Sequence, residues 1–289
     1  MSSLDSTQMR IAAQQNAFKV AAIQMASGPN VAGNLSEARR LVANAAEQGA
    51  KLVVLPEFFA IMGMSEQDKV KVREQAGQGP IQQFLSETAR QHKIWLMGSL
   101  PLVAGAPDKV RNSLLVYDET GAQVARYDKI HLFNLTLGNE SYNEAQTIEA
   151  GDKVVVIDSP FGRIGLAICY DLRFPELFRA MKDVDILVLP SAFTATTGKV
   201  HWEPLIRARA IENLAYVIAA AQGGYHVSGR ETHGHSMIVD PWGRVMDELQ
   251  RGSGVVMADV NPSYQKSLRN SLPALTHRTI SCTCCDKKA

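Results

Sequence analysis

The sequence has no long apolar run, no excess of charge of one sign and very little cysteine. Its 30 lysines and arginines nearly balance 29 aspartates and glutamates, so the net charge of +1 gives no long-range attraction to nucleic acid or to an anionic membrane. The uncharged run AYVIAAA at 215–221 is far shorter than the roughly 20 residues that span a bilayer. We therefore expect no membrane span and no nucleic-acid partner, but a small molecule or another protein.

Cysteine is too scarce for a disulfide framework. Cys169 stands alone, and Cys282, Cys284 and Cys285 crowd into the last eight residues, which favours a reducing cytoplasm as the location. The tail lacks the second ligand pair of a zinc site, and His233 and His235 lie two apart without a His-x-x-x-His helix. A Gly-rich phosphate loop is also absent. The sequence predicts no metal and no cofactor.

The sequence does contain enough apolar residues, 46% of the chain, for one large domain. We expect this domain over 18–280, a polar N-terminal extension over 1–17 and a C-terminal tail over 281–289. The N-terminus lacks the basic start and apolar stretch of a signal peptide. No low-complexity block or Gly/Ser linker divides the chain.

Strand and helix patterns alternate along this domain. Apolar runs predict strands at 18–26, 51–57 and 94–100. Helical spacing predicts a first helix capped by Asn34, with Glu37 three residues on, and a second that Pro80 opens. Hairpins are expected at 113–127, 154–169 and 236–249, and helices at 175–182, 203–214 behind Pro204, and 262–271. The pattern is typical of an α/β fold, and the echo between KLVVLPEFF at 51–59 and DILVLPSAF at 185–193 suggests two related halves, each a sheet covered outside by helices.

Three of these strands deliver a reactive group just past their ends. Glu57 ends KLVVLPE, Lys129 follows the strand in ARYDKIHLF, and Cys169 ends RIGLAIC. A thiol with a pKa near ~8.5 needs a neighbouring base or cation to act as a nucleophile. Glu57 would provide the base and Lys129 the cation. Taken singly, a buried thiol or a solvated charge is the simpler explanation for each residue, so their combination carries the hypothesis.

These three motifs resemble the carbon–nitrogen hydrolase (nitrilase) superfamily, whose members have a Glu, a Lys and a Cys in this chain order. LPE, YDKIHLF and CYDLRFPE match its motifs, and the similarity extends from about 18 to 278. The resemblance implies a four-layer αββα sandwich that pairs into a homodimer or higher homo-oligomer, with no metal and no organic cofactor. It also implies a second glutamate that holds the lysine: YNEAQTIEAGD assigns this role to Glu144, in preference to Glu140.

Within the superfamily, PSAFTATTGKVHWEPLIRARAIENLAYVIAAAQGG and GHSMIVDPWG are most similar to deaminated glutathione amidases, with ω-amidases next. The resemblance implies hydrolysis of a linear, terminal amide of an α-keto acid to carboxylate and ammonia. The chain departs from the pattern in HRTISCTCCDKKA and in LTLGNESYN, which bears on the identity of the substrate.

The implied reaction is a two-step acyl transfer. Cys169 attacks the amide carbon, Glu57 transfers protons, and a water hydrolyses the thioester, while the backbone N–H of Tyr170 joins Lys129 in an oxyanion site. Arg173 is expected either to bind a substrate carboxylate or to form an ion pair with Asp171 or Glu176. The remaining expectations concern side chains beyond the 185–193 strand: Phe193, Thr194 and Thr197 as lining of the substrate pocket or as loop structure, and His201 and Trp202 as packing at the start of a helix.

Two other classes are open at this point. His131, two residues from Lys129, would pair with Cys169 in a cysteine–histidine hydrolase, although the chain lacks the sequence around the cysteine that such proteases have. A non-catalytic interaction module with the same fold is the second alternative, and the intact Glu57, Lys129 and Cys169 argue against it.

Overall fold

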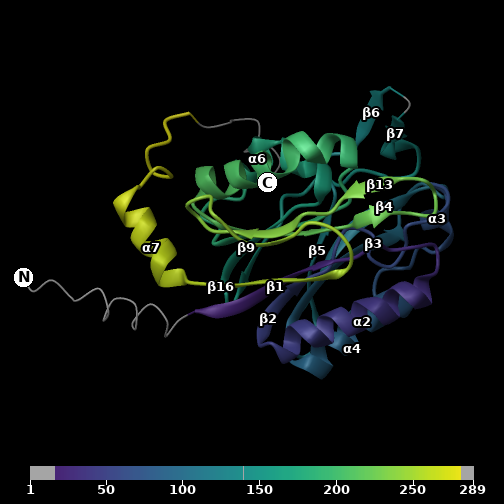
Figure 1. Ribbon diagram of the computed structural model, residues 1–289, viewed down its shortest axis with the longest axis horizontal. Helices are drawn as coiled ribbons and strands as arrows, with labels where there is room; N and C mark the ends of the chain where they lie inside the picture. Colours follow the sequence, from purple (N-terminus) through teal and green to yellow (C-terminus); the bar gives the residue numbers. More distant parts are fainter. Residues whose placement is uncertain (1–16, 139, 281–289) are drawn as a thin grey trace, which may run out of the picture.

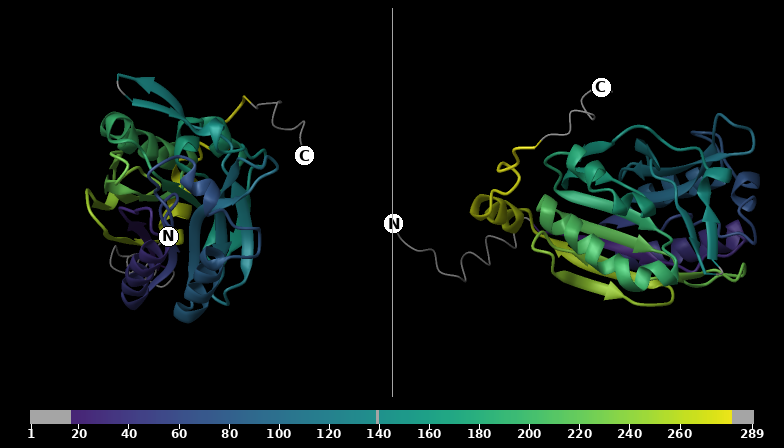
Figure 2. Two further views of the ribbon diagram at one scale, coloured as in Figure 1. Left: turned by 90° about the vertical axis from the view of Figure 1, so that its right-hand side faces the viewer. Right: turned by 90° about the horizontal axis from the view of Figure 1, so that it is seen from above.

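Two six-stranded sheets lie face to face, and helices cover the outer face of each (Figure 1, Figure 2). The computed structural model describes residues 17–138 and 140–280. The first sheet has the order β16-β1-β2-β3-β4-β5, formed by Gly254–Val260, Phe18–Gln24, Ala50–Val54, Trp95–Val103, Val110–Tyr117 and Gln123–Asp128. The second has the order β15-β14-β11-β10-β9-β8, formed by Val245–Leu249, Ser236–Val239, Tyr216–Ala221, Ile186–Ser191, Gly162–Leu166 and Val156–Ser159. The expected α/β fold, a four-layer αββα sandwich, is confirmed.

The two sheets have the same plan. Each has three parallel strands at its centre, β1-β2-β3 in one and β9-β10-β11 in the other. Each parallel set has an antiparallel pair on one side and a single antiparallel strand on the other. Strands β2 and β10, which carry the echoed sequences, occupy the same place in this plan. The short repeat therefore reflects two halves of like topology.

The helices fall into two groups. Two of them, α2 (Val31–Glu47) and α4 (Pro80–His92), cover the first sheet. The longest, α6 (Ala195–Asn213), covers the second sheet and packs on α5 (Pro175–Ala180). The last, α7 (Pro262–Ser271), lies at one end of the molecule (Figure 1), where Arg269 donates to Asp185 at 2.8 Å. None of the helices in the described ranges combines the length and apolar character that a membrane crossing needs.

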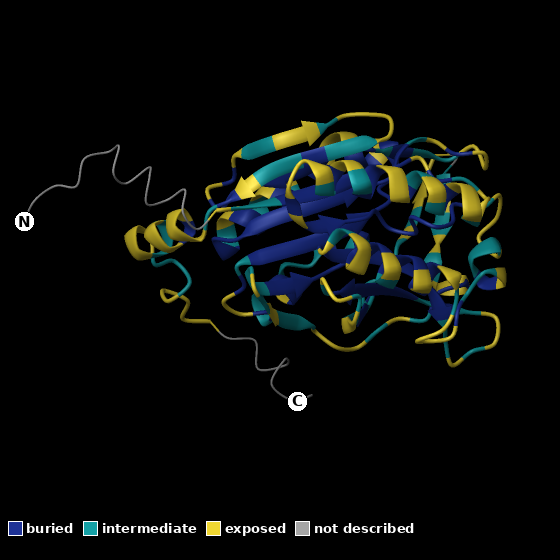
Figure 3. Cartoon of the chain, turned by 90° about the horizontal axis from the view of Figure 1, so that it is seen from below, coloured by how far each residue is buried: buried dark blue, intermediate teal, exposed yellow. Residues whose placement is uncertain are grey.

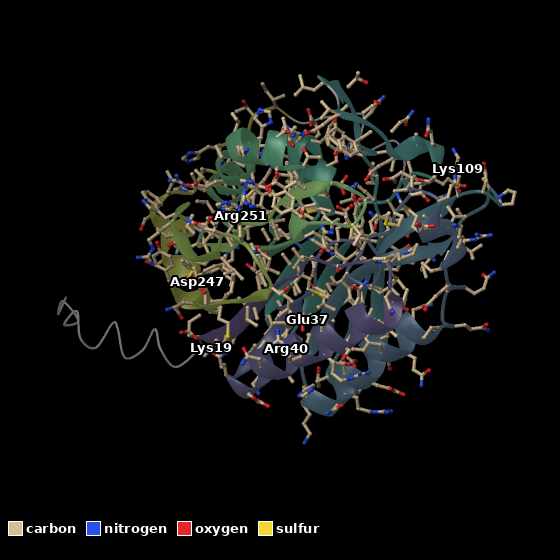
Figure 4. All side chains as sticks on the ribbon, turned by 45° about the vertical axis from the view of Figure 1, so that its right-hand side comes forward. Lys19, Glu37, Arg40, Lys109, Asp247 and Arg251 are labelled. Carbon is tan, nitrogen blue, oxygen red and sulfur yellow. The ribbon has the colours of Figure 1, made fainter. Side chains whose placement is uncertain are left out.

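Alternating side chains of β1 separate two layers of core. Val20 and Ala22 join the core between the sheets, whereas Ala21 and Ile23 join the core between the first sheet and its helices. Because successive side chains of a strand point to opposite faces, an apolar strand of this kind is buried on both sides. Figure 3 shows the result: the central strands are buried, and the helices that cover the two sheets expose an outer stripe. On that stripe, Glu37 and Arg40 of α2 form a surface ion pair at 2.7 Å (Figure 4).

Two helix starts differ from the sequence expectation. Helix α2 begins at Val31, and its cap is Asn30, whose side chain accepts from Gly33 N. Asn34 is instead buried and donates to the carbonyl oxygens of Gly28 and Ala60, both at 2.8 Å. The proposed Asn34 cap was therefore wrong, because tertiary contacts use that amide.

Helix α6 begins at Ala195, eight residues before the expected start, and Pro204 lies inside it. Proline removes the donor to the carbonyl of Val200, and Val200 is 66% exposed, so water can hydrate that carbonyl. The buried face of α6 also includes polar residues such as Arg209 and Asn213, which obscured the apolar period in the sequence.

Short elements gather at the end of the sandwich opposite α7 (Figure 1). They are α3 (Asp68–Lys71), the hairpin β6–β7 (Asn134–Leu137 and Glu140–Asn143), the 3-10 turns η1 (Glu144–Gln146) and η2 (Cys169–Arg173), and the hairpin β12–β13 (Gly223–Tyr225 and Glu231–His233). The carboxyl ends of the central parallel strands point toward this cluster. Side chains that are distant in the sequence meet there.

Candidate active site

A buried lysine lies between two carboxylates. Lys129 Nζ is 3.0 Å from Glu57 Oε1 and 2.8 Å from Glu144 Oε2, and both Lys129 and Glu57 are almost wholly buried. Glu57 follows β2, Lys129 follows β5, and Glu144 opens η1. The contact that the sequence resemblance assigned to Glu144 is therefore present.

The backbone around Glu144 fixes that carboxylate. Phe133 N donates to Glu144 Oε2 at 2.8 Å, and Glu144 N donates to the carbonyl of Phe133 at 2.9 Å. Glu140, the less favoured choice, points elsewhere and accepts from Thr196 Oγ1 at 2.5 Å.

Cys169 lies at a sharp turn just beyond β9. Its φ angle is +50°, a left-handed conformation that costs a non-glycine residue roughly 1–3 kcal/mol and is concentrated at functional sites. Phe58, the residue after Glu57, has the same φ of +50°. The side chain of Cys169 is a free thiol, 7% exposed. After burial and the charge of Lys129, it is the next cause that acts on the pKa of Glu57, which it lowers.

The charges in this cluster favour a neutral thiol beside an ionised carboxylate. Burial, helped by the charge of Glu57, raises the pKa of the Cys169 thiol well above its ordinary value. Burial also opposes ionisation of Glu57, but the Lys129 ammonium, a hydrogen bond from Cys169 and the charge of Arg230 together outweigh burial and lower the pKa of that carboxyl. Although burial alone would lower it, the pKa of Lys129 is raised by Glu144 and Glu57. The resting site is therefore a thiol, a carboxylate and an ammonium, so a nucleophilic attack by this thiol would require proton transfer to a base.

A buried amide aligns Glu57. Asn112 Nδ2 donates to Glu57 Oε1 at 2.8 Å, and Asn112 Oδ1 accepts from Ser99 Oγ at 3.1 Å. Ser99 Oγ in turn accepts from Phe58 N at 3.0 Å, so these hydrogen bonds close a ring that starts and ends at adjacent residues. Sequence reasoning missed Asn112, because a single Asn within an apolar strand carries no chemical signal.

Asp171 connects the 3-10 turn η2, which begins at Cys169, to the segment around Lys129. This buried carboxylate accepts from Tyr127 Oη at 2.7 Å, His131 N at 3.0 Å and Ile168 N at 2.9 Å. The ring of His131 also contacts it through Nδ1 at 2.7 Å and stacks on Phe174. His131 is thus held by Asp171, and no contact to Cys169 is present for a cysteine–histidine pair. From the sequence, Asp171 was considered only as an ion-pair partner for Arg173.

Arg173 does not form either of the two ion pairs considered for it. Within the described ranges, neither Asp171 nor Glu176 lies within ion-pair distance of its guanidinium. Arg173 Nη1 lies 3.2 Å from His201 Nδ1, and the guanidinium lies over the rings of Tyr170 and Phe193. This charge is therefore available at the mouth of a pocket.

That narrow pocket contains the other expected lining residues. Its walls are Phe133, Glu144, Cys169, Tyr170, Arg173, Ala192, Phe193, Thr194, Thr197 and Arg230. Thr194 and Thr197 also have a structural part, since their hydroxyls lie 2.9 Å apart and Thr194 caps α6. Trp202 is buried and donates to the carbonyl of His235 at 2.7 Å. It lies in the middle of α6 and not at the start of the helix, where the sequence predicted it.

A larger cavity of about 560 Å³ lies on the Glu57 side of the cluster. Its walls include Glu57, Glu66, Lys69, Glu140, Tyr142 and Arg230. Four residues line both spaces: Phe133, Glu144, Ala192 and Arg230. Over residues 17–138 and 140–280, no group of three or more His, Cys, Asp or Glu side chains is arranged to hold a metal ion. The expected tail, with Cys282, Cys284 and Cys285, lies outside the described residues, as does the N-terminal extension up to residue 16.

The fold and this cluster agree with the comparison to known proteins. The carbon-nitrogen hydrolase family model matches residues 19–270, and the chain belongs to this family. The deaminated glutathione amidase of a Synechocystis species is 43% identical over 271 residues, which cover 91% of this chain and 98% of that protein.

Solved structures show the same relationship. The NitFhit protein of C. elegans superposes with a TM-score of 0.84 at 37% identity, covering 91% of this chain and 65% of NitFhit. Nit3 of Saccharomyces cerevisiae, described as a member of branch 10 of the nitrilase superfamily, has a TM-score of 0.82 at 33% identity and covers 91% of this chain and 97% of that one.

Proposed function

We propose that this chain is a cysteine-dependent amidase that hydrolyses the amide of an α-keto acid, with deaminated glutathione as the preferred substrate. The observation that carries the proposal is the Lys129 ammonium between Glu57 and Glu144, beside the Cys169 thiol. The family supports hydrolysis of a carbon–nitrogen bond. Relatives named deaminated glutathione amidase match about nine-tenths of the chain, and they support this choice of substrate.

In the proposed first step, Cys169 Sγ attacks the amide carbon while Glu57 takes the thiol proton. The tetrahedral oxyanion accepts hydrogen bonds from Lys129 Nζ and from the backbone N–H of Tyr170, which lies in the first turn of η2. Loss of one such donor typically costs ~3 kcal/mol of transition-state stabilisation. The C–N bond then breaks, Glu57 returns its proton to the departing nitrogen, and a thioester remains on Cys169.

In the second step, Glu57 removes a proton from a water that attacks the thioester carbonyl. The thiolate leaves and regains that proton, and the α-keto dicarboxylate departs. Glu57 therefore transfers one proton in each direction per half-reaction, which a carboxyl that is ionised at rest can do. The small pocket, with Phe193, Thr194 and Thr197 on its walls, is proposed to hold the acyl chain, and Arg173 to bind its carboxylate.

A second candidate is an ω-amidase acting on α-ketoglutaramate. The two substrates share their acyl group and differ in the leaving group. Deaminated glutathione carries cysteinylglycine on the amide nitrogen and releases that amine, so the ammonia expected from the sequence applies only to α-ketoglutaramate, which is a primary amide. Both release 2-oxoglutarate, so one assay for that product compares them directly.

The experiment is 2-oxoglutarate release from both amides, together with mass spectrometry of the denatured enzyme for an acyl group on Cys169. We expect a kcat/KM for deaminated glutathione at least tenfold above that for α-ketoglutaramate, and no turnover by Cys169→Ala. Turnover that survives in Cys169→Ala would contradict the mechanism. A non-catalytic module would show no turnover and no protection of Cys169 by either amide against a thiol label.

The assembly and location belong to the same proposal. We propose a homodimer that pairs through the outer helical face, where Ile211 of α6 and the nearby Trp242 are exposed apolar side chains. Light scattering after size exclusion would measure the mass. We further propose a single catalytic domain over 18–280, since β1 and β16 pair along seven residues near its two ends, and a cytoplasmic location, where the free Cys169 thiol stays reduced.

A further inference from the structure

The two spaces around the cluster lie on either side of the position that the scissile bond of a substrate would take. Cys169 lines the narrow pocket, and Glu57 lines the 560 Å³ cavity. The nucleophile must touch the carbonyl carbon, while the general acid must touch the nitrogen that leaves. The acyl group therefore belongs on the Cys169 side and the leaving group on the Glu57 side, where there is room for much more than ammonia.

Arg230 lies where the two spaces meet, and its charge is unpaired. Among the described residues, no carboxylate lies within ion-pair distance of its guanidinium. Its Nη2 donates to the carbonyl of Ala192, 2.5 Å away, and its Nε is buried without a hydrogen-bond partner. An unpartnered buried donor on a charged group costs more than an unpartnered neutral one, so it needs a partner from outside the chain.

The hairpin β12–β13 places this guanidinium. His233 N donates to the carbonyl of Phe193 at 2.9 Å, and Thr232 bridges to Thr194, so the hairpin is attached to the chain just after β10. Arg230 precedes β13, and its side chain passes over the ring of Tyr142 at 5.2 Å. It is thereby held beside the cluster from the cavity side.

The other charges of the cavity leave Arg230 its positive character. Glu66 and Lys69 form an ion pair with each other. Glu140 Oε1 accepts from Thr196, and Glu140 Oε2 is buried without a partner, which suits an N–H or S–H donor of a ligand. Glu57 and Glu144 share Lys129. Arg230 is thus the one cation on the cavity wall, within the described ranges, that no carboxylate neutralises.

We propose that Arg230 is a specificity-determining residue that binds the carboxylate of the leaving amine, so that the 560 Å³ cavity is a leaving-group site for a short peptide with a free C-terminus. This inference rests on the proposed function and adds a second arginine to it. Arg173 serves the carboxylate of the acyl group, and Arg230 serves the carboxylate at the other end. A primary amide, which lacks that second carboxylate, uses only the first.

The test measures 2-oxoglutarate release from three amides: deaminated glutathione, its C-terminal carboxamide and α-ketoglutaramate. In the unmodified enzyme we expect kcat/KM for the free carboxylate to exceed that for the carboxamide by about 10- to 100-fold, the range of a charge-assisted hydrogen bond. Arg230→Gln should reduce this ratio to near one. Arg173→Gln should lower kcat/KM for all three substrates by a similar factor and keep the ratio between the free carboxylate and the carboxamide.

Arg251 provides a matched control. It pairs with Glu231, the residue next to Arg230, and its side chain is 61% exposed on the surface (Figure 4). Arg251→Gln removes the same charge from the same region, outside the cavity, and should keep the ratio of the unmodified enzyme.

Each outcome has one meaning. A ratio near one in the unmodified enzyme, or a ratio that survives in Arg230→Gln, overturns the inference. Circular dichroism shows whether Arg230→Gln is folded; if it is not, Arg230→Lys replaces it, and the loss of the planar fork should still reduce the ratio severalfold. Absence of 2-oxoglutarate from all three amides would overturn the proposed function, whereas turnover without a carboxylate preference would overturn only the role of Arg230.

Discussion

Tyr127 Oη donates a hydrogen bond of 2.7 Å to Oδ2 of Asp171. Tyr127 lies near the end of β5 in the first sheet, and Asp171 lies in η2, which follows β9 of the second sheet, so this bond joins the two halves next to the cluster. Burial, followed by the charge of Asp171, raises the pKa of Tyr127 well above its ordinary value. The phenol therefore stays a donor at every working pH.

Removing this hydroxyl should weaken the joint between the halves. Tyr127→Phe leaves Asp171 with its backbone donors but without one charge-assisted bond, which is worth about 1.5–3 kcal/mol. We expect a lower urea midpoint and a loss of kcat, since the bond holds the Cys169 turn against the Lys129 loop. Tyr117→Phe is the control, because that buried hydroxyl makes only a 3.4 Å contact with Gln123. Equal losses in the two variants would show that the joint has no special role.

Asn112→Asp should move the acid limb of the pH profile upward. The new carboxylate would lie beside Glu57, and a like charge raises the pKa of its neighbour. In the unmodified enzyme Lys129 and its neighbours overcome burial and hold the pKa of Glu57 below its ordinary value, so kcat/KM should stay level into the acid range. Because turnover needs the ionised base, it should be lost at a higher pH in the variant. Ser99→Ala, which leaves Asn112 on Glu57, should keep the limb in place, and a limb that moves downward in Asn112→Asp would contradict the role of Glu57 as base.

Glu57→Gln should lower the pKa of the Cys169 thiol while it greatly reduces turnover. Apart from burial, the charge of Glu57 is the largest cause that raises the thiol pKa, so its removal should shift the pH midpoint of alkylation downward. Turnover should fall by ~10²–10⁴ with loss of the general base. Iodoacetamide labelling across pH measures the midpoint, in a background where Cys282, Cys284 and Cys285 are changed to serine. A midpoint that rises, or turnover that persists, would refute this assignment.

Two helical glycines should respond in opposite directions to alanine. A Cβ at Gly198 of α6 would lie 2.3 Å from Cγ of His233, whereas one at Gly33 of α2 meets nothing closer than 3.7 Å. Alanine gains about 1 kcal/mol over glycine within a helix, so Gly33→Ala should raise the melting temperature. In Gly198→Ala the clash outweighs this gain, and the melting temperature should fall. Since His233 belongs to the hairpin that carries Arg230, the same variant should also weaken the carboxylate preference.

The sequence predicted the parts of the molecule whose signals are local. Strands, hairpins and α7 follow from apolar runs, turn residues and a proline at a helix start. The predicted start of α6 was wrong. Thr194 caps this helix, and its buried face includes the polar residues Arg209 and Asn213, so the apolar period that marks a helix was hidden. The Asn34 cap failed for a similar reason, since Asn34 makes its bonds to distant carbonyls.

The cluster itself was predictable only where chemistry and motif agree. Glu57, Lys129, Glu144 and Cys169 are reactive types within recognisable motifs. Asn112, Asp171 and Arg230 act by position, and their positions depend on contacts between residues far apart in the sequence, such as that of Asn112 with Glu57, which is 55 residues away. No period or spacing in one sequence reports such a contact.

The reactive groups are divided between the two halves of like topology. The base and the ammonium follow strands of one half, and the thiol follows a strand of the other. Neither half holds a complete set, so a chain severed in the exposed segment at 152–154 would yield two inert fragments whose reassociation restores turnover. During synthesis on the ribosome, we expect the growing chain to stay inactive at least until the second half, which carries Cys169, has been made.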